Sequence, residues 1–148
     1  MKFRVFAIAV FAIGLCSFVM SQFLVGPQDV AERNPDFAST TTLVTDENYR
    51  AIVLASEKPV VLDFYGDYCP VCRQLEPQLL PVAEEHADAA LFARVNVVES
   101  PELAEQYQVR AVPTLVMIHQ GEVLFQSEGL SALSTLQTAL QKATKPQG

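Results

Sequence analysis

Two cysteines with two residues between them, Cys69 and Cys72, are the side chains in this sequence best suited to chemistry. A thiolate is a nucleophile, and two thiols at this spacing can close a small disulfide ring. Pro70 follows Cys69 directly, and proline is favoured at the first position of a helix, where its missing N–H costs little. The pattern predicts that Cys69 is the N-cap of a helix and that Cys72 lies one turn further along the same face.

This predicted helix start would activate one sulfur more than the other. A sulfur at an N-cap faces the free N–H groups of the first turn, here those of Val71 and Cys72, and the positive end of the helix dipole. Both features favour the thiolate over the thiol. We therefore predict that Cys69 is the attacking cysteine and that Cys72 is the resolving cysteine.

Half of a zinc site is the main alternative for this pair. Such a site needs a second pair of ligands at a similar spacing. The remaining candidates are Cys16, His86 and His119, and no two of them are close in sequence. We therefore favour a redox-active pair and predict neither a bound metal nor a cofactor.

A buried strand is predicted directly before the helix. Val60–Tyr65 is an apolar run of β-forming residues that holds a single acid, Asp63, and the next three residues suit a turn in which Asp67 is a solvated charge. Burial would raise the pKa of Asp63, so that it could hold a proton near neutral pH and act as the base for Cys72. A structural acid with satisfied hydrogen bonds is the alternative.

Strands and helices alternate in the rest of the predicted domain. Predicted strands cover residues 40–44, 60–65, 91–97, 114–118 and 122–127, and predicted helices cover about 47–55, 70–86, 101–107 and the segment after Ser131. Thr45 or Asp46 is expected to cap the helix at 47, and Ser100 the helix at 101. This order predicts an α/β fold with a central mixed sheet and helices on both faces.

Three motifs, in their order and spacing, resemble the thioredoxin family from about residue 39 to residue 145. They are VVLDFYGDYCPVCRQLEP at 60–77, VRAVPT at 109–114, and QGE at 120–122 followed by an apolar strand and Gly129. The resemblance implies a thioredoxin fold for residues 39–148 and thiol:disulfide oxidoreductase activity. It also implies a cis Val112–Pro113 bond beside the sulfurs, with the Val112 backbone free to pair with an extended substrate. An ordinary proline at a strand start is the alternative.

The resemblance assigns further roles around the cysteines. Asp63 matches a buried aspartate of the family, and Arg94 stands at the position of a lysine beside it, where a fixed charge would tune the acid. Tyr65 and Tyr68 occupy positions that are usually aromatic, so they are expected either to line an apolar docking surface or to pack in the core. The expected substrate contacts are Tyr68, Pro70, Val71, Val112 and Pro113.

The direction of the reaction is expected to depend on the two residues between the cysteines. Cytoplasmic thioredoxins have Gly-Pro there and strongly oxidising periplasmic enzymes have Pro-His, whereas this chain has Pro70-Val71. This pair tunes thiolate stability and so the redox potential. Without a histidine we favour the reduction of disulfides in exported proteins, as in the membrane-tethered thioredoxin-like proteins that DFYGDYCPVC resembles. A disulfide oxidase or isomerase, or a non-catalytic module that binds client chains, is the alternative.

The first residues are expected to act as a targeting signal. Two positive charges precede the uncharged residues 5–25, which as a helix would span about 31 Å, close to the hydrocarbon thickness of a bilayer. We predict that residues 1–26 anchor the chain in the cytoplasmic (inner) membrane, that 27–38 are a linker, and that the domain faces the periplasm or exterior. A signal peptide cleaved near Ser21, which would release the domain into the periplasm, or a lipid on Cys16 is the alternative. Each option exports the domain to a compartment that permits disulfides.

The charge of the chain limits its partners. The formal net charge is −7, which argues against binding to nucleic acid. The expected partners are protein disulfides and dithiols, together with an electron donor in the membrane that restores the reduced cysteines.

Overall fold

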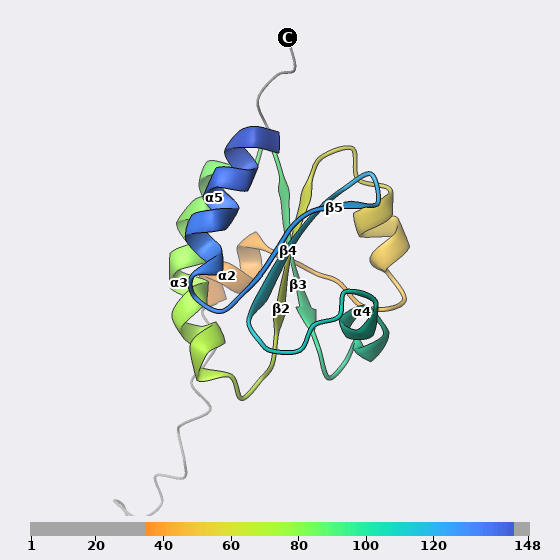
Figure 1. Cartoon of the computed structure of the whole chain (residues 1–148), viewed down its shortest axis with the longest axis vertical. Helices are drawn as coiled ribbons and strands as arrows, with labels where there is room; N and C mark the ends of the chain where they lie inside the picture. Colours follow the sequence, from red (N-terminus) through yellow and green to blue (C-terminus); the bar gives the residue numbers. More distant parts are fainter. Residues whose placement is uncertain (1–34, 144–148) are drawn as a thin grey trace, which may run out of the picture. The chain divides into compact units, whose positions relative to one another are not determined.

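In the computed structural model, which describes residues 35–143, five strands form one mixed sheet in the order β1-β3-β2-β4-β5 (Figure 1). β3 runs parallel to β1 and β2, whereas β4 is antiparallel to both β2 and β5. The strands are β1 (Thr42–Leu43), β2 (Val60–Tyr65), β3 (Leu91–Asn96), β4 (Thr114–His119) and β5 (Glu122–Glu128). The helices are α2 (Pro35–Thr40), the π-helical turn η1 (Arg50–Leu54), α3 (Pro70–Glu85), α4 (Pro101–Gln106) and α5 (Ala132–Ala143).

The central strand β2 sets the position of the cysteines. All six of its residues are buried, as expected for a strand that is apolar on both faces and pairs with β3 and β4 on its two sides. Its carboxyl end leads through a short turn into α3. The predicted strand at 60–65 is therefore confirmed, and it fixes the start of α3 at one edge of the sheet.

Helices cover both faces of the sheet, as predicted (Figure 1). On one face α2, α3 and α5 bury a core that includes Leu75, Met117 and Leu136. On the other face, covered by η1 and α4, the hydroxyls of Tyr49 and Tyr107 hydrogen-bond to each other. Burial, together with the hydrogen bond to Tyr49, raises the pKa of Tyr107 above that of an ordinary tyrosine.

The domain begins earlier than the sequence predicted. Residues 35–38 were expected to belong to the linker, but they form the start of α2, and Phe37 is fully buried against the core. A single apolar residue among short polar ones gives no helical periodicity, so the segment could not be identified from its pattern.

The α-helix predicted at 47–55 is shorter than expected. The structure has a π-helical turn over Arg50–Leu54 in its place.

The predicted membrane segment, residues 1–26, and residues 27–34 of the predicted linker lie outside the described residues. Between residues 35 and 143, none of the helices combines the length and the apolar character needed to span a bilayer.

The helix α3 continues through two internal prolines, Pro77 and Pro81. Both prolines are exposed, whereas the buried stripe of the helix runs through Leu75, Leu79 and Val82. The backbone groups that a proline leaves without a helical partner therefore face water, which can satisfy them. The prediction of one helix through residue 86 is confirmed to within one residue.

The short helix α4 is capped by a residue distant in sequence. Ser100 occupies the N-cap as predicted, but its buried hydroxyl makes no hydrogen bond to the described residues. The carboxylate of Asp46 instead accepts hydrogen bonds from the N–H groups of Glu102, at 3.3 Å, and Leu103, at 3.0 Å. Asp46, which was expected to cap the helix at 47, thus stabilises a different helix.

We predict that Asp46→Ala lowers the free energy of unfolding by about 1 kcal/mol, because two N–H groups at the start of α4 lose their acceptor. Ser100→Ala is the matched control and should change stability by less than about 0.5 kcal/mol, since it removes a hydroxyl without a partner. Urea denaturation followed by circular dichroism measures both values. A larger loss for Ser100→Ala than for Asp46→Ala would contradict this assignment of the cap.

Candidate active site

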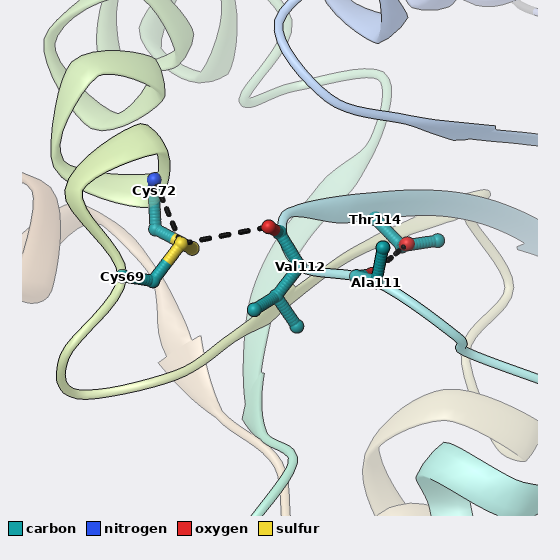
Figure 2. Close-up of a disulfide and its surroundings, with 5 residues drawn as sticks. All are labelled: Cys69, Cys72, Ala111, Val112 and Thr114. Carbon is teal, nitrogen blue, oxygen red and sulfur yellow. Dashed lines mark hydrogen bonds between the residues drawn. A yellow bond between two sulfur atoms is a disulfide. The ribbon is translucent and has the colours of Figure 1, made fainter.

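Cys69 occupies the N-cap of α3 and Pro70 its first helical position, as the spacing predicted. Cys69 and Cys72 form a disulfide with their Cα atoms 5.3 Å apart. Figure 2 shows the backbone N–H of Cys72 directed at the sulfur of Cys69, and the N···Sγ distance is 3.1 Å. An otherwise unpaired donor of the first helical turn is therefore satisfied by the sulfur.

A second polar group lies on the other side of the same sulfur. The carbonyl oxygen of Val112 is 3.5 Å from Cys69 Sγ (Figure 2). A disulfide sulfur carries no proton, so this contact can become a hydrogen bond only when Cys69 is reduced to a thiol. For a thiolate the carbonyl is unfavourable, but the N–H of Cys72 is closer and acts with the helix dipole. The N–H of Cys72 and the start of the helix are therefore the groups at this sulfur that would favour negative charge.

The two sulfurs differ in their access to solvent. Cys69 is 9% exposed and Cys72 is 2% exposed. Both pack with Tyr65 in a small cluster that Val112 partly covers. A substrate disulfide can therefore reach Cys69 more readily than Cys72, which fits an attacking role for the first and a resolving role for the second.

The segment before β4 forms the opposite wall of the site. The Val112–Pro113 peptide bond is cis. Thr114 fixes the turn, because its hydroxyl donates a hydrogen bond of 2.6 Å to the carbonyl of Ala111 (Figure 2). The N–H of Gly129 donates to the carbonyl of Pro113 at 2.8 Å, and Gly129 has a φ of +73°, which favours glycine. The first two sequence motifs thus meet at the disulfide. Gly129 of the third motif binds Pro113, whereas residues 120–122 lie at the opposite end of β4.

A buried acid and a buried arginine are neighbours in the two central parallel strands. Asp63 is 3% exposed and Arg94 is 7% exposed, and they are register neighbours in the parallel strands β2 and β3. The guanidinium of Arg94 lies 4.7 Å from the ring centroid of Tyr65 and 5.6 Å from that of Phe37. Tyr65 in turn packs against both cysteines, so the arginine is connected to the site through an aromatic ring.

The two predicted aromatic residues have different surroundings. Tyr65 is buried, whereas Tyr68 is 91% exposed immediately before Cys69. Pro70 is exposed and Val71 is 38% exposed, directly after the same cysteine. Of the two readings for the tyrosines, core packing therefore holds for Tyr65, and Tyr68 is accessible to a partner.

Two polar side chains near the site were not assigned a role from the sequence. Glu76 is buried although it is charged, and its place four residues after Cys72, on the packing stripe of α3, could have indicated this. Asp67 is exposed as predicted, but its carboxylate accepts hydrogen bonds from the buried side chain of Asn96. No sequence pattern links those two positions.

The described part of the chain shows no grouping of three or more His, Cys, Asp or Glu side chains that could hold a metal ion. The candidate site therefore consists of the disulfide, the buried pair Asp63 and Arg94, and the wall at Val112 and Pro113.

Comparisons with known proteins agree with this geometry. A family model described as Thioredoxin matches residues 40–142. Thioredoxin C-2 of Corynebacterium nephridii is 34% identical over 99 residues, which cover 67% of this chain and 92% of that protein. Thioredoxin 1 of Synechococcus elongatus is 33% identical over 104 residues, 70% of this chain and 97% of that protein.

Solved structures add a likeness of fold. The crystal structure of Malassezia sympodialis thioredoxin, Mala s 13, superimposes with a TM-score of 0.63 at 24% identity. The match covers 70% of this chain and 90% of that chain. At this level of identity the likeness shows that the two chains share a fold.

Proposed function

Because the chain belongs to the thioredoxin family and is a thioredoxin-like disulfide oxidoreductase, we propose that it reduces protein disulfides with Cys69 as the attacking sulfur. One observation carries this assignment: the N–H of Cys72 donates to Cys69 Sγ at the start of α3. The donor and the helix dipole both favour a thiolate on Cys69, and Cys69 is the more exposed of the two sulfurs.

The first step is an exchange at a substrate disulfide. In the reduced protein the thiolate of Cys69 attacks one sulfur of the substrate, so a mixed disulfide forms as the substrate S–S bond breaks. The second substrate sulfur leaves as a thiolate and takes a proton from water. The backbone of Val112, whose carbonyl is next to Cys69 Sγ, is placed to pair with an extended substrate segment.

The second step releases the substrate. Cys72 gives its thiol proton to the carboxylate of Asp63, and its thiolate attacks the sulfur of Cys69. The bond between Cys69 and the substrate breaks, the substrate leaves as a thiolate that is then protonated, and the Cys69–Cys72 disulfide forms. Two electrons have then passed from the protein to the substrate. Asp63 is the candidate for this base because it is an acid buried in the central strand that leads to the cysteines, and Arg94 is its register neighbour in β3.

The exposed residues around Cys69 supply the docking surface in this proposal. Tyr68, Pro70 and Val71 contact the substrate on one side of the sulfur, and Val112 and Pro113 on the other. Tyr68 supports this most strongly, since an aromatic ring that is 91% exposed can bury much apolar surface on contact with a partner.

The compartment is also part of the proposal. The basic residues at 2 and 4 followed by the uncharged residues 5–25 support an anchor in the cytoplasmic membrane, with the domain on the far side. The substrates are then exported proteins, and the electron donor that reduces Cys69–Cys72 again is a membrane protein. Cleavage of the N-terminal segment would place the same domain free in the periplasm.

We predict that Cys72→Ala traps substrates in intact cells, because the mixed disulfide on Cys69 then has no resolving thiol. Affinity purification without reductant, followed by mass spectrometry, should recover proteins that dithiothreitol releases. Exported proteins should predominate among them.

The control is the double variant Cys69→Ser with Cys72→Ala, which should trap nothing. Trapped proteins that are all cytoplasmic would contradict the exported location while leaving the chemistry intact. If the purified wild-type chain also fails to reduce a protein disulfide with dithiothreitol as donor, the proposed function is wrong.

The direction of the reaction has its own test. Equilibration of Cys69–Cys72 with glutathione should give a reduction potential near that of thioredoxin, about −270 mV, because no histidine stabilises the thiolate from between the cysteines. A reduction potential of about −120 mV, which is typical of a strong disulfide oxidase, would show that the protein oxidises its substrates and would overturn the reductase assignment.

A further inference from the structure

The side chain of Asn96 joins two loops at the edge of the sheet where the cysteines lie. Its Nδ2 donates to both carboxylate oxygens of Asp67, each at 3.2 Å, and its Oδ1 accepts from the N–H of Val98 at 3.0 Å. Asp67 lies two residues before Cys69, and Val98 lies in the loop between β3 and α4. We call these three residues the Asn96 clasp.

The clasp can form because β2 and β3 are parallel, so that their carboxyl ends meet at one edge of the sheet (Figure 1). The N–H of Val97 also donates to the carbonyl of Tyr65, at 3.0 Å, across this edge. Backbone and side-chain bonds together therefore tie the turn before Cys69 to the loop after β3.

The amide of Asn96 is used in a way that fixes its orientation. Only the oxygen of an amide can accept from an N–H, so the bond from Val98 directs Nδ2 towards the carboxylate of Asp67. Asn96 is 2% exposed, and a buried amide that lost these partners would be costly. The carboxylate of Asp67 carries a charge, which strengthens the bonds that it accepts.

Two exposed apolar side chains lie at or next to residues of the clasp. Tyr68 follows Asp67 and is 91% exposed, while Val98 is 75% exposed. Asn96 binds the backbone N–H of Val98 itself, and it binds the side-chain carboxylate of Asp67, the residue before Tyr68. Both exposed apolar side chains therefore come from the two loops that Asn96 joins, at the edge that carries Cys69.

We propose that Asn96 is a positioning residue for protein substrates: it holds Tyr68 and Val98 in the arrangement that a protein disulfide contacts as it reaches Cys69. This inference rests on the proposed function, since it requires Cys69 to attack a disulfide. A small disulfide can reach Cys69 without spanning the two loops, so its reduction should not depend on the clasp. The dependence on substrate size distinguishes positioning from a general effect on the sulfur.

The test compares two substrates of the full-length chain, insulin and glutathione disulfide, with dithiothreitol as the electron source. Asn96→Asp places two carboxylates against each other. We expect kcat/KM for insulin to fall about tenfold, mainly because KM rises. For glutathione disulfide we expect kcat/KM to change less than about twofold. The double variant Asn96→Asp with Asp67→Asn exchanges donor and acceptor and keeps the total charge. It should restore kcat/KM for insulin to within about threefold of wild type.

Two further variants keep the test decisive. Asp67→Asn alone alters an exposed residue and should lower kcat/KM for insulin about threefold, even if Asn96→Asp folds poorly. Glu99→Gln removes an exposed charge from the same loop outside the clasp and should leave both substrates unaffected.

The inference is overturned if Asn96→Asp and Asp67→Asn leave the reduction of insulin unchanged, if both substrates lose rate equally, or if the double variant gives no recovery. A wild-type chain that reduces neither substrate would instead show that the proposed function itself is wrong.

Discussion

One hydrogen bond, from the N–H of Cys72 to the sulfur of Cys69, is the contact on which the chemistry of this protein depends. It exists because a helix must leave its first N–H groups without helical partners, and the sulfur is placed where one of them points. A thiolate in that position gains both a donor and the favourable end of the helix dipole. The remaining features of the fold serve to hold the start of α3 in place and to control what else approaches Cys69.

The sheet provides the rigid reference for that helix. β2 is buried over its whole length and delivers the turn before Cys69, while its neighbours β3 and β4 contribute Arg94 and the segment at Val112 and Pro113. Elements far apart in sequence therefore converge on one sulfur from different sides. The Asn96 clasp adds a connection between the two loops at the carboxyl ends of the parallel strands. Residues that never touch the substrate sulfur can thus determine which substrates reach it.

Much of this could be predicted from the sequence, for identifiable reasons. The N-cap at Cys69 followed from a local rule about proline and free N–H groups. The central strand followed from an apolar run of β-forming residues interrupted only by Asp63. The contacts that could not be predicted join distant positions. Asp46 caps α4, Asn96 binds Asp67, and Phe37, in a segment that was expected to be linker, packs into the core. The burial of Glu76 was not predicted, although its spacing of four residues from Cys72 on α3 could have indicated it.

The most direct measurement of the central claim is the pH dependence of alkylation of Cys69 in the reduced, full-length chain. Peptide mapping separates the product from those of Cys72 and Cys16. The account predicts that iodoacetamide modifies Cys69 before Cys72, and that its rate rises with a midpoint well below about 8.5, the value for an ordinary cysteine. A midpoint at or above that value, or faster modification of Cys72, would contradict a thiolate stabilised at the start of α3.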